Sequence, residues 1–257
     1  MFSLNKWYFD VTTPDGDVAI AYCAEVRWGP LRQPVSGLLV APASGTPAPW
    51  RFSPREVDEP VLDDRSLRWS SGPLSLSIDY ARCVPGVDHR LYDSPSGRID
   101  WHCVVPRGEV RMRIGERELV GDGYAERLSL TLLAWKIPAD EIRWGRFIAK
   151  DTSVIWIDWR GEHPLCLAFV DGQLEPAVSI SESSIRFADG RELRLVEDRV
   201  LGDDALGGLL SPLESLRPLL EPITRTRQTR WLSRGTLHSG DGIATPGWAV
   251  HEIVRRR

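Results

Sequence analysis

The chain has 257 residues, a formal net charge of -4 and a hydrophobic fraction of 42%. This is the composition of an ordinary globular protein with a core. The length allows one large β domain or two of about 120–130 residues each. The slightly acidic balance argues against nucleic acid as the main partner, because phosphate binding requires a concentrated basic face.

The N-terminal residues run directly into strand-like sequence and lack the basic and apolar regions of a signal peptide. No stretch approaches the roughly 20 apolar residues of a membrane-spanning helix. Cys23, Cys83, Cys103 and Cys166 are widely spaced, so we expect reduced and mostly buried thiols. These features predict a cytoplasmic protein without stable membrane insertion.

Apolar side chains alternate with polar ones in four segments, residues 18–27, 74–80, 99–105 and 154–159. A period of two is typical of antiparallel strands with one buried face. Short Gly, Pro and Asp clusters predict tight turns between strands; they fall at residues 14–16, 95–97, 106–108, 171–172, 189–190 and 240–242. Only residues 206–220 have a helical pattern, which Pro212 and Pro218 keep short. The chain is therefore predicted to be all-β.

The two halves of the chain share a faint pattern. In the first half, Trp101 precedes Gly-Asp-Gly-Tyr-Ala-Glu at residues 121–126. In the second, Trp231 precedes Gly-Asp-Gly at 240–242 and Gly-Trp-Ala-Val-His-Glu at 247–252. This echo predicts two related β lobes, residues 1–130 and 131–257. Chance similarity between two hairpins is the alternative.

Four landmarks carry a family resemblance: Trp-Tyr-Phe-Asp at residues 7–10 before the turn at 14–16, the 121–126 segment, Trp-Gly-Arg-Phe at 144–147 with Val-Ile-Trp-Ile at 154–157, and the 247–252 segment. In this order they resemble the AttH-like/carotenoid 1,2-hydratase (hydroxyneurosporene synthase) superfamily. The resemblance implies two tandem lipocalin-like barrels that enclose an apolar cavity. It also implies hydration or cyclisation of polyenes and terpenes by protonation of a double bond, or ring closure on polyketide chains in more distant relatives.

The sequence departs from the hydratases of that superfamily at one motif. Those enzymes follow the tyrosine with a His-Asp pair and soon afterwards an Asn-Trp-Gly. Here Ala125 and Glu126 follow Tyr124, and Trp144-Gly145 lies well downstream. The departure argues against carotenoid hydration itself and leaves the expected fold unchanged.

Three residues are candidates for the catalytic chemistry: Glu126, Asp10 and Tyr124. A carboxylic acid that desolvation keeps neutral can protonate a double bond, and aromatic faces stabilise the resulting cation. Alternation places Tyr124 on the same side as Glu126, and Tyr8 on the same side as Asp10. The alternatives are a surface Glu126 paired with Arg127 or Arg146, and a solvent-facing Asp10 at a strand end.

Aromatic and polar residues of the predicted strands are candidates for ligand binding. They are Trp7, Tyr8, Trp101, His102, Trp144, Arg146, Trp156, Trp248 and Glu252. For each tryptophan, packing in the core is the competing interpretation. His102 could equally be a hydrogen-bonded structural residue, and Glu252 could bond within the barrel.

The leading hypothesis is a cofactor-independent hydratase, cyclase or isomerase acting on a hydrophobic polyene, terpenoid or polyketide by acid catalysis in an apolar cavity, with Glu126 or Asp10 as the proton donor. A non-catalytic carrier or sensor of a hydrophobic ligand is the second hypothesis, and a pair of lobes filled by their own side chains is the third. The histidines lack metal-ligand spacing, and the sequence contains no nucleophile elbow, Walker A loop or dinucleotide fingerprint. We therefore expect neither a metal nor a cofactor.

Overall fold

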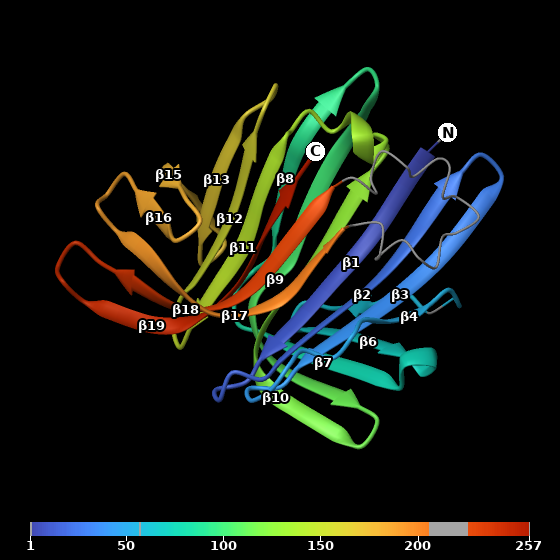
Figure 1. Cartoon of the computed structure of the whole chain (residues 1–257), viewed down its shortest axis with the longest axis horizontal. Coiled ribbons are helices and arrows are strands. Elements are labelled where there is room, and N and C mark those ends of the chain that lie inside the picture. Colours follow the sequence, from blue (N-terminus) through green and yellow to red (C-terminus); the bar gives the residue numbers. More distant parts are fainter. Residues whose placement is uncertain (1, 57, 206–225, 257) are drawn as a thin grey trace. The chain divides into compact units, whose positions relative to one another are not determined.

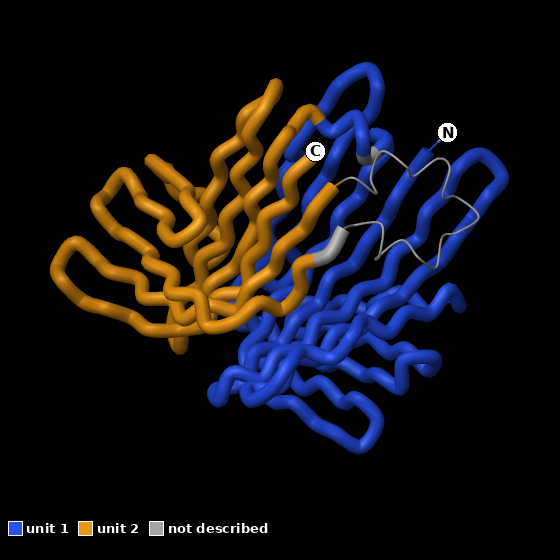
Figure 2. Tube along the Cα trace, viewed as in Figure 1, with its two compact units in different colours: residues 1–137, 212–214 blue, residues 138–211, 215–257 orange. Residues whose placement is uncertain are grey.

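The computed structural model describes residues 2–56, 58–205 and 226–256. These residues fall into two compact units that meet in sequence at Ile137 and Pro138 (Figure 2). The domain limits expected from sequence, 1–130 and 131–257, stay a prediction. The expected helical segment, 206–220, lies outside the described residues, within which no helix is long and apolar enough to cross a membrane.

The first unit is one ten-stranded antiparallel sheet (Figure 1). Its strands are β1 (Phe2–Thr12), β2 (Val18–Trp28), β3 (Leu31–Ala41), β4 (Arg51–Ser53), β5 (Val61–Leu62), β6 (Ser66–Ser71), β7 (Leu76–Arg82), β8 (Val87–Ser94), β9 (Gly97–Ile114) and β10 (Arg117–Leu130). Two short 3-10 helices, η1 (Gly72–Leu74) and η2 (Ala134–Lys136), complete it. The strand order is β4-β3-β2-β1-β10-β9-β7-β6-β5, with β8 beside β9.

The second unit is a nine-stranded antiparallel sheet. Its strands are β11 (Glu141–Ala149), β12 (Ser153–Arg160), β13 (Leu165–Val170), β14 (Gln173–Glu175), β15 (Ala177–Ile180), β16 (Ser184–Phe187), β17 (Glu192–Ala205), β18 (Arg227–His238) and β19 (Ala244–Arg255). Their order is β14-β13-β12-β11-β19-β18-β17-β16-β15.

In both sheets the two edge strands are neighbours in the chain. Because a short segment connects them, each sheet must curl to bring its two edges within reach of that segment. In the first unit the edges are β4 and β5; in the second they are β14 and β15, which only Pro176 separates. The first and last strands of each unit, β1 with β10 and β11 with β19, pair in the middle of the sheet. The prediction of an all-β protein with two tandem lipocalin-like barrels is confirmed.

Apart from β8, the two sheets have the same topology, and both have a glycine where the first and last strands meet closely. A Cβ atom on Gly121 would lie 2.1 Å from the Thr12 carbonyl oxygen, and one on Gly247 would lie 2.3 Å from that of Ile148. In both units, the residue five positions after this glycine is a glutamate, Glu126 or Glu252. The two lobes therefore have the same topology, while the sequence echo between them stays a prediction.

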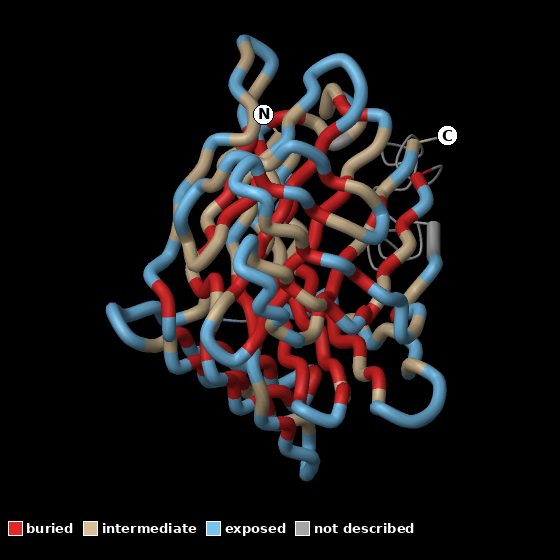
Figure 3. The backbone as a smooth tube through the Cα atoms, turned by 90° about the vertical axis from the view of Figure 1, so that its left-hand side faces the viewer, coloured by how far each residue is buried: buried red, intermediate tan, exposed pale blue. Residues whose placement is uncertain are grey.

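Side chains fill much of each barrel interior. In the first unit, Phe9 of β1 stacks on Trp69 of β6 with ring centroids 4.9 Å apart, although these strands are not neighbours in the sheet. In the second, Phe147 and Trp156 belong to a core cluster with residues of β15 to β19. Buried residues follow the strands, and the turns between them are exposed (Figure 3).

The turn predicted at residues 106–108 is wrong, because β9 runs unbroken from Gly97 to Ile114. Instead, the pairing of β9 with β10 shifts register between Gly123 and Ala125 and again between Ala125 and Glu126. Such bulges accommodate a proline, which has no N–H for the ladder. Pro106 therefore marks an irregular strand, while the turns expected at 14–16, 95–97, 171–172, 189–190 and 240–242 are present.

Substitution of Gly123 by alanine tests the close approach of β1 and β10. The new Cβ would lie 2.1 Å from the Asp10 carbonyl oxygen, so the strands must separate, at a cost of roughly 1–3 kcal/mol. Gly72→Ala is the matched control, because a Cβ there meets no atom within 4 Å. Urea unfolding should show the loss for Gly123→Ala alone; equal stability of both variants would contradict the argument.

Candidate functional site

The polar face of β1 differs from its apolar face. Trp7 and Phe9 belong to the core cluster of the first unit, while Tyr8 and Asp10 point to the other side of the strand. Asp10 is fully buried. Its Oδ1 accepts a hydrogen bond from the Tyr124 backbone N–H (3.2 Å), and its Oδ2 accepts one from the Tyr8 hydroxyl (3.3 Å). The alternative interpretation, a solvent-facing Asp10 at a strand end, is therefore wrong, because Asp10 is fully buried.

Glu126 lies on the same face, directly opposite Tyr8 in the ladder. One of its carboxylate oxygens, Oε2, accepts hydrogen bonds from the Tyr124 hydroxyl at 2.6 Å and from the indole N–H of Trp101. Tyr124 and Trp101 are buried, whereas Glu126 is partly exposed. The guanidinium of Arg127, a partner considered for Glu126 from sequence, lies over the Trp7 ring at 5.7 Å.

Burial governs protonation around Glu126. Desolvation raises the pKa of Tyr124 well above its ordinary value, and the neighbouring Cys103 and Glu126 raise it further. Desolvation, followed by the charge of Glu126, likewise raises the pKa of Cys103. Both side chains therefore keep their protons at neutral pH, and the Tyr124 hydroxyl lies in hydrogen-bonding contact with the Cys103 thiol as well as with Glu126.

Two residues of this site were not among the candidates from sequence. The Tyr80 hydroxyl reaches the backbone of β1 and β10, at 2.8 Å from the Asp10 carbonyl oxygen and 3.0 Å from that of Tyr124. Cys103, paired with Glu126 across the ladder, was interpreted only as a buried thiol. The available signal was chemical: a tyrosine in a buried strand face needs a hydrogen-bond partner.

The second unit carries different chemistry at the equivalent glutamate. Glu252 Oε2 accepts hydrogen bonds from Arg230 (Nε, 2.8 Å) and from Gln228 (2.6 Å). Arg230 pairs with Glu252 in the ladder, at the place that Cys103 takes beside Glu126. A guanidinium therefore holds Glu252, which bonds within its own sheet as the alternative interpretation expected, whereas a phenol and an indole hold Glu126.

The remaining ligand-binding candidates of the first unit lie away from Glu126. Trp7 packs on the opposite face of β1, in the core cluster. His102 Nδ1 lies 2.7 Å from the Asp88 carboxylate, with a quarter of its side chain exposed. Of the candidates on this unit, the structure brings together Tyr8, Asp10, Trp101, Tyr124 and Glu126.

The other candidates belong to the second unit. Trp156 is a core residue, and Trp144 is 9% exposed. Arg146 is fully buried, and its Nη1 donates to the Trp248 carbonyl oxygen at 3.3 Å. The guanidinium of Arg234 covers the Trp248 ring at 4.7 Å. Trp156 therefore packs in the core, which was the competing interpretation to ligand binding.

A polar pair lies inside the second barrel. Ser233 Oγ and His251 Nε2 are 2.8 Å apart and buried. The imidazole stacks on Trp231, with ring centroids 5.3 Å apart, and lies 6.1 Å from the Trp156 ring. Burial lowers the pKa of His251 to about 4, although the charge of Glu252 acts in the opposite direction. His251 is therefore neutral at physiological pH.

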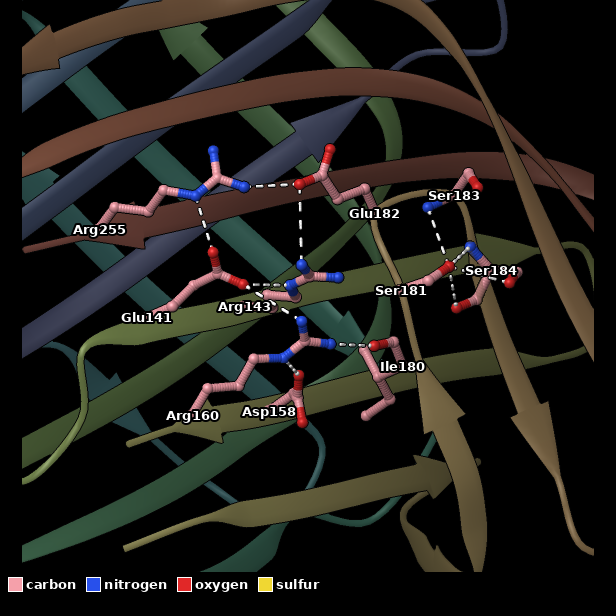
Figure 4. Close-up of polar contacts among 10 residues, drawn as sticks. All are labelled: Glu141, Arg143, Asp158, Arg160, Ile180, Ser181, Glu182, Ser183, Ser184 and Arg255. Atoms are coloured by element: carbon pink, nitrogen blue, oxygen red, sulfur yellow. Dashed lines mark hydrogen bonds and ion pairs between the residues drawn. The ribbon is translucent and has the colours of Figure 1, made fainter. Parts of the chain in front are cut away.

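A network of ion pairs lies across β12, β11 and β19, and one hydrogen bond connects it to β15 (Figure 4). Arg160 of β12 donates to the Ile180 carbonyl oxygen of β15 at 2.8 Å, and its Nε donates to Asp158 at 2.9 Å. Glu141 accepts hydrogen bonds from Arg143 and Arg255, both at 2.7 Å. Because β12 and β15 are not paired in the sheet, the Arg160 contact helps to hold the barrel closed. Glu182 pairs with Arg143 and Arg255, so three carboxylates match three guanidinium groups, which is typical of a structural network.

The free thiols are Cys23, Cys83, Cys103 and Cys166. Cys83 and Cys166 are exposed, so the prediction of mostly buried thiols holds for only two of the four. Within the described part of the chain, no three His, Cys, Asp or Glu side chains gather closely enough to hold a metal ion.

Comparison with known proteins identifies the fold. No protein-family model and no curated protein matches the chain in sequence. A putative AttH from Nitrosomonas europaea aligns with 100% of this chain and 94% of its own, with a TM-score of 0.60 and 12% identity. CghA, solved with Sch210972, aligns over 99% and 89% (TM-score 0.61, 11% identity), and kievitone hydratase from Nectria haematococca over 98% and 88% (TM-score 0.57, 10% identity). The chain has the AttH-like fold. The sequence resemblance is thereby confirmed at the level of architecture.

The buried His251 predicts a specific loss of stability in acid. Its pKa is about 4 in the folded state against an ordinary 6.5, so the unfolded chain takes up a proton that the folded chain refuses. The contribution is complete above pH 6.5 and falls by about 2 kcal/mol between pH 7.5 and pH 5. In urea unfolding at both pH values, His251→Gln should lack this increment, whereas a substitution of the exposed His163 by Gln should retain it. An equal pH dependence of wild type and His251→Gln would contradict the assignment.

Proposed function

We propose that the chain is a cofactor-independent hydratase, cyclase or isomerase of a hydrophobic small molecule, with Glu126 as the proton-transferring group. The observation that supports this most directly is the setting of Glu126. It is a partly exposed carboxylate held by two buried neutral donors, the Tyr124 hydroxyl and the Trp101 indole N–H. That one solved protein of the same fold is named a hydratase adds support by analogy only.

In this proposal Glu126 acts first as a general base. The Tyr124 hydroxyl and the Trp101 indole N–H both donate to its Oε2, an arrangement suited to hold the carboxylate while it accepts a proton. In a hydration, Glu126 takes one proton from a water molecule while the water oxygen bonds to one carbon of the double bond. The other carbon then receives the proton from Glu126, so that one water has been added and the enzyme is unchanged.

This order favours a polarised double bond over an isolated one. Protonation of an unactivated alkene requires a strong acid at the outset, whereas addition to a bond conjugated with a carbonyl group starts from a base. Among the polyene, terpenoid and polyketide classes expected from the sequence, the geometry therefore favours a polyketide-like substrate with a conjugated carbonyl. The same base could remove a proton next to that carbonyl and return it elsewhere, which is an isomerisation.

Tyr124 and Asp10 have separate roles in this proposal. Tyr124 keeps its proton and fixes the carboxylate of Glu126 through the 2.6 Å hydrogen bond. Asp10 is a positioning residue, because its Oδ1 binds the Tyr124 backbone N–H and its Oδ2 binds the Tyr8 hydroxyl. Trp101 supplies the second donor to Glu126 and an apolar surface beside it.

A carrier or sensor of a small ligand is the second candidate function. The observation that favours it is a cavity of about 260 Å³ in the first unit, where Trp7, Cys23 and Pro34 lie beside charged residues such as Glu59 and Arg32. Glu126 is not part of its lining. A carrier that uses this cavity would bind its ligand regardless of the state of Glu126.

Glu126→Gln separates the two functions. We expect wild type to convert a member of a panel of linear polyenes, terpenoids and α,β-unsaturated ketones, detected by mass spectrometry of the products. Loss of the acid–base group should lower kcat by about 10²–10⁴ while ligand affinity, measured by tryptophan quenching, stays the same. Tyr124→Phe should lower kcat less, because the Trp101 donor remains.

Glu116→Gln is the matched control, since Glu116 is exposed on the same unit and should behave as wild type. Unchanged turnover in Glu126→Gln would exclude Glu126 as the proton-transferring group. Saturable quenching without turnover in either protein would favour the carrier.

A further inference from the structure

The cavity of the first unit is separate from the Glu126 site. Its volume is about 260 Å³ and its apolar wall includes Trp7 and Pro34. Trp7 lies on the face of β1 opposite Tyr8, and Tyr8 is the ladder neighbour of Glu126. The volume is a little below the roughly 300–1,000 Å³ of most ligand pockets. It therefore suits a small molecule.

The lining has more negative than positive charge. Glu25, Glu56, Asp58 and Glu59 contribute carboxylates, and Arg32 contributes a guanidinium. Arg32 is already engaged, because it binds Glu25 and, at 2.7 Å, Glu56. Across the described residues, Asp58 and Glu59 have no ion-pair partner, so their charge is available to a ligand.

Cys23 is a second and independent feature of the same cavity. Its side chain lines the cavity, yet the residue is only 7% exposed. Among the described residues the thiol has no hydrogen-bond partner. Burial and then the charge of Glu59 raise the pKa of Cys23 to about 12. The thiol is therefore neutral and offers a weak acceptor for an N–H group, and Glu59 lies near enough to influence it.

We infer that this cavity binds a small organic ammonium ion, with the charged nitrogen toward Asp58 and Glu59 and the apolar part against Trp7 and Cys23. A cavity lined by one sign of charge attracts the opposite charge, and the aromatic wall accommodates a hydrocarbon body. A carboxylate or phosphate of the same size would be repelled. The inference does not depend on the proposed function of Glu126.

Three probes of similar shape and different charge test it: benzylammonium, benzyl alcohol and benzoate, measured by isothermal titration calorimetry at low ionic strength. Benzylammonium should bind at least tenfold more tightly than benzyl alcohol, and benzoate should not bind. Raising the salt concentration should reduce this preference, because exposed charges are screened.

The double variant Asp58→Asn/Glu59→Gln should lose at least fivefold in affinity for benzylammonium. Asp15→Asn/Glu116→Gln is the matched control, because it makes the same change of net charge at exposed positions outside the lining. It should bind as wild type. Glu126→Gln should also bind benzylammonium as wild type, which keeps this test distinct from the test of catalysis.

Three results would overturn the inference. The first is equal affinity for benzylammonium and benzyl alcohol. The second is an equal loss in the Asp58/Glu59 variant and its control, which would assign binding to overall charge. The third is no binding of benzylammonium, n-butylammonium or tryptammonium by wild type.

Discussion

The close contact between the first and last strands of the first unit is the constraint on which its other features depend. Gly121 and Gly123 leave no room for a side chain, because their Cβ atoms would lie 2.1 Å from backbone oxygens of β1. This contact pairs residues more than one hundred positions apart and joins the two ends of the meander. It also brings the Asp10 carboxylate to the Tyr124 backbone N–H. The central pairing of the sheet and the polar cluster therefore have the same origin.

The first and last strands of the second unit, β11 and β19, also pair in the middle of their sheet, but the side chains around them differ. Gly247 meets Ile148 as Gly121 meets Thr12, and a glutamate follows five residues later in both. In the second unit Arg230 holds that glutamate, so its charge is neutralised within the sheet. In the first unit the ladder neighbour of Glu126 is Cys103, and the Tyr124 hydroxyl and the Trp101 indole N–H donate to the carboxylate. One backbone position thus supports an ion pair in one lobe and a candidate acid–base group in the other.

The irregular pairing of β9 with β10 places the donors around Glu126. Two register shifts flank Ala125, where β9 has extra residues around Pro106. In a regular ladder, the side chains of β9 opposite Glu126 would alternate strictly between the two faces of the sheet. The bulges change which β9 residues face Glu126. As a result, Trp101 donates to the Glu126 carboxylate and Cys103 contacts the Tyr124 hydroxyl. The Tyr80 hydroxyl then satisfies the carbonyl oxygens of Asp10 and Tyr124.

The amino-acid sequence by itself determined the strand class, most turns and the two-lobed architecture, because alternation and turn residues are local properties. It also brought Asp10, Tyr124 and Glu126 forward as candidates, since strand alternation assigns residues to faces. Only the tertiary structure decided which face of each strand meets which neighbour. That is why Trp156 is a core residue, why Trp7 borders the cavity of the first unit and not the Glu126 site, and why Glu252 binds Arg230. The roles of Cys103 and Tyr80 depend on strand pairing and bulges between distant segments, which no local pattern encodes.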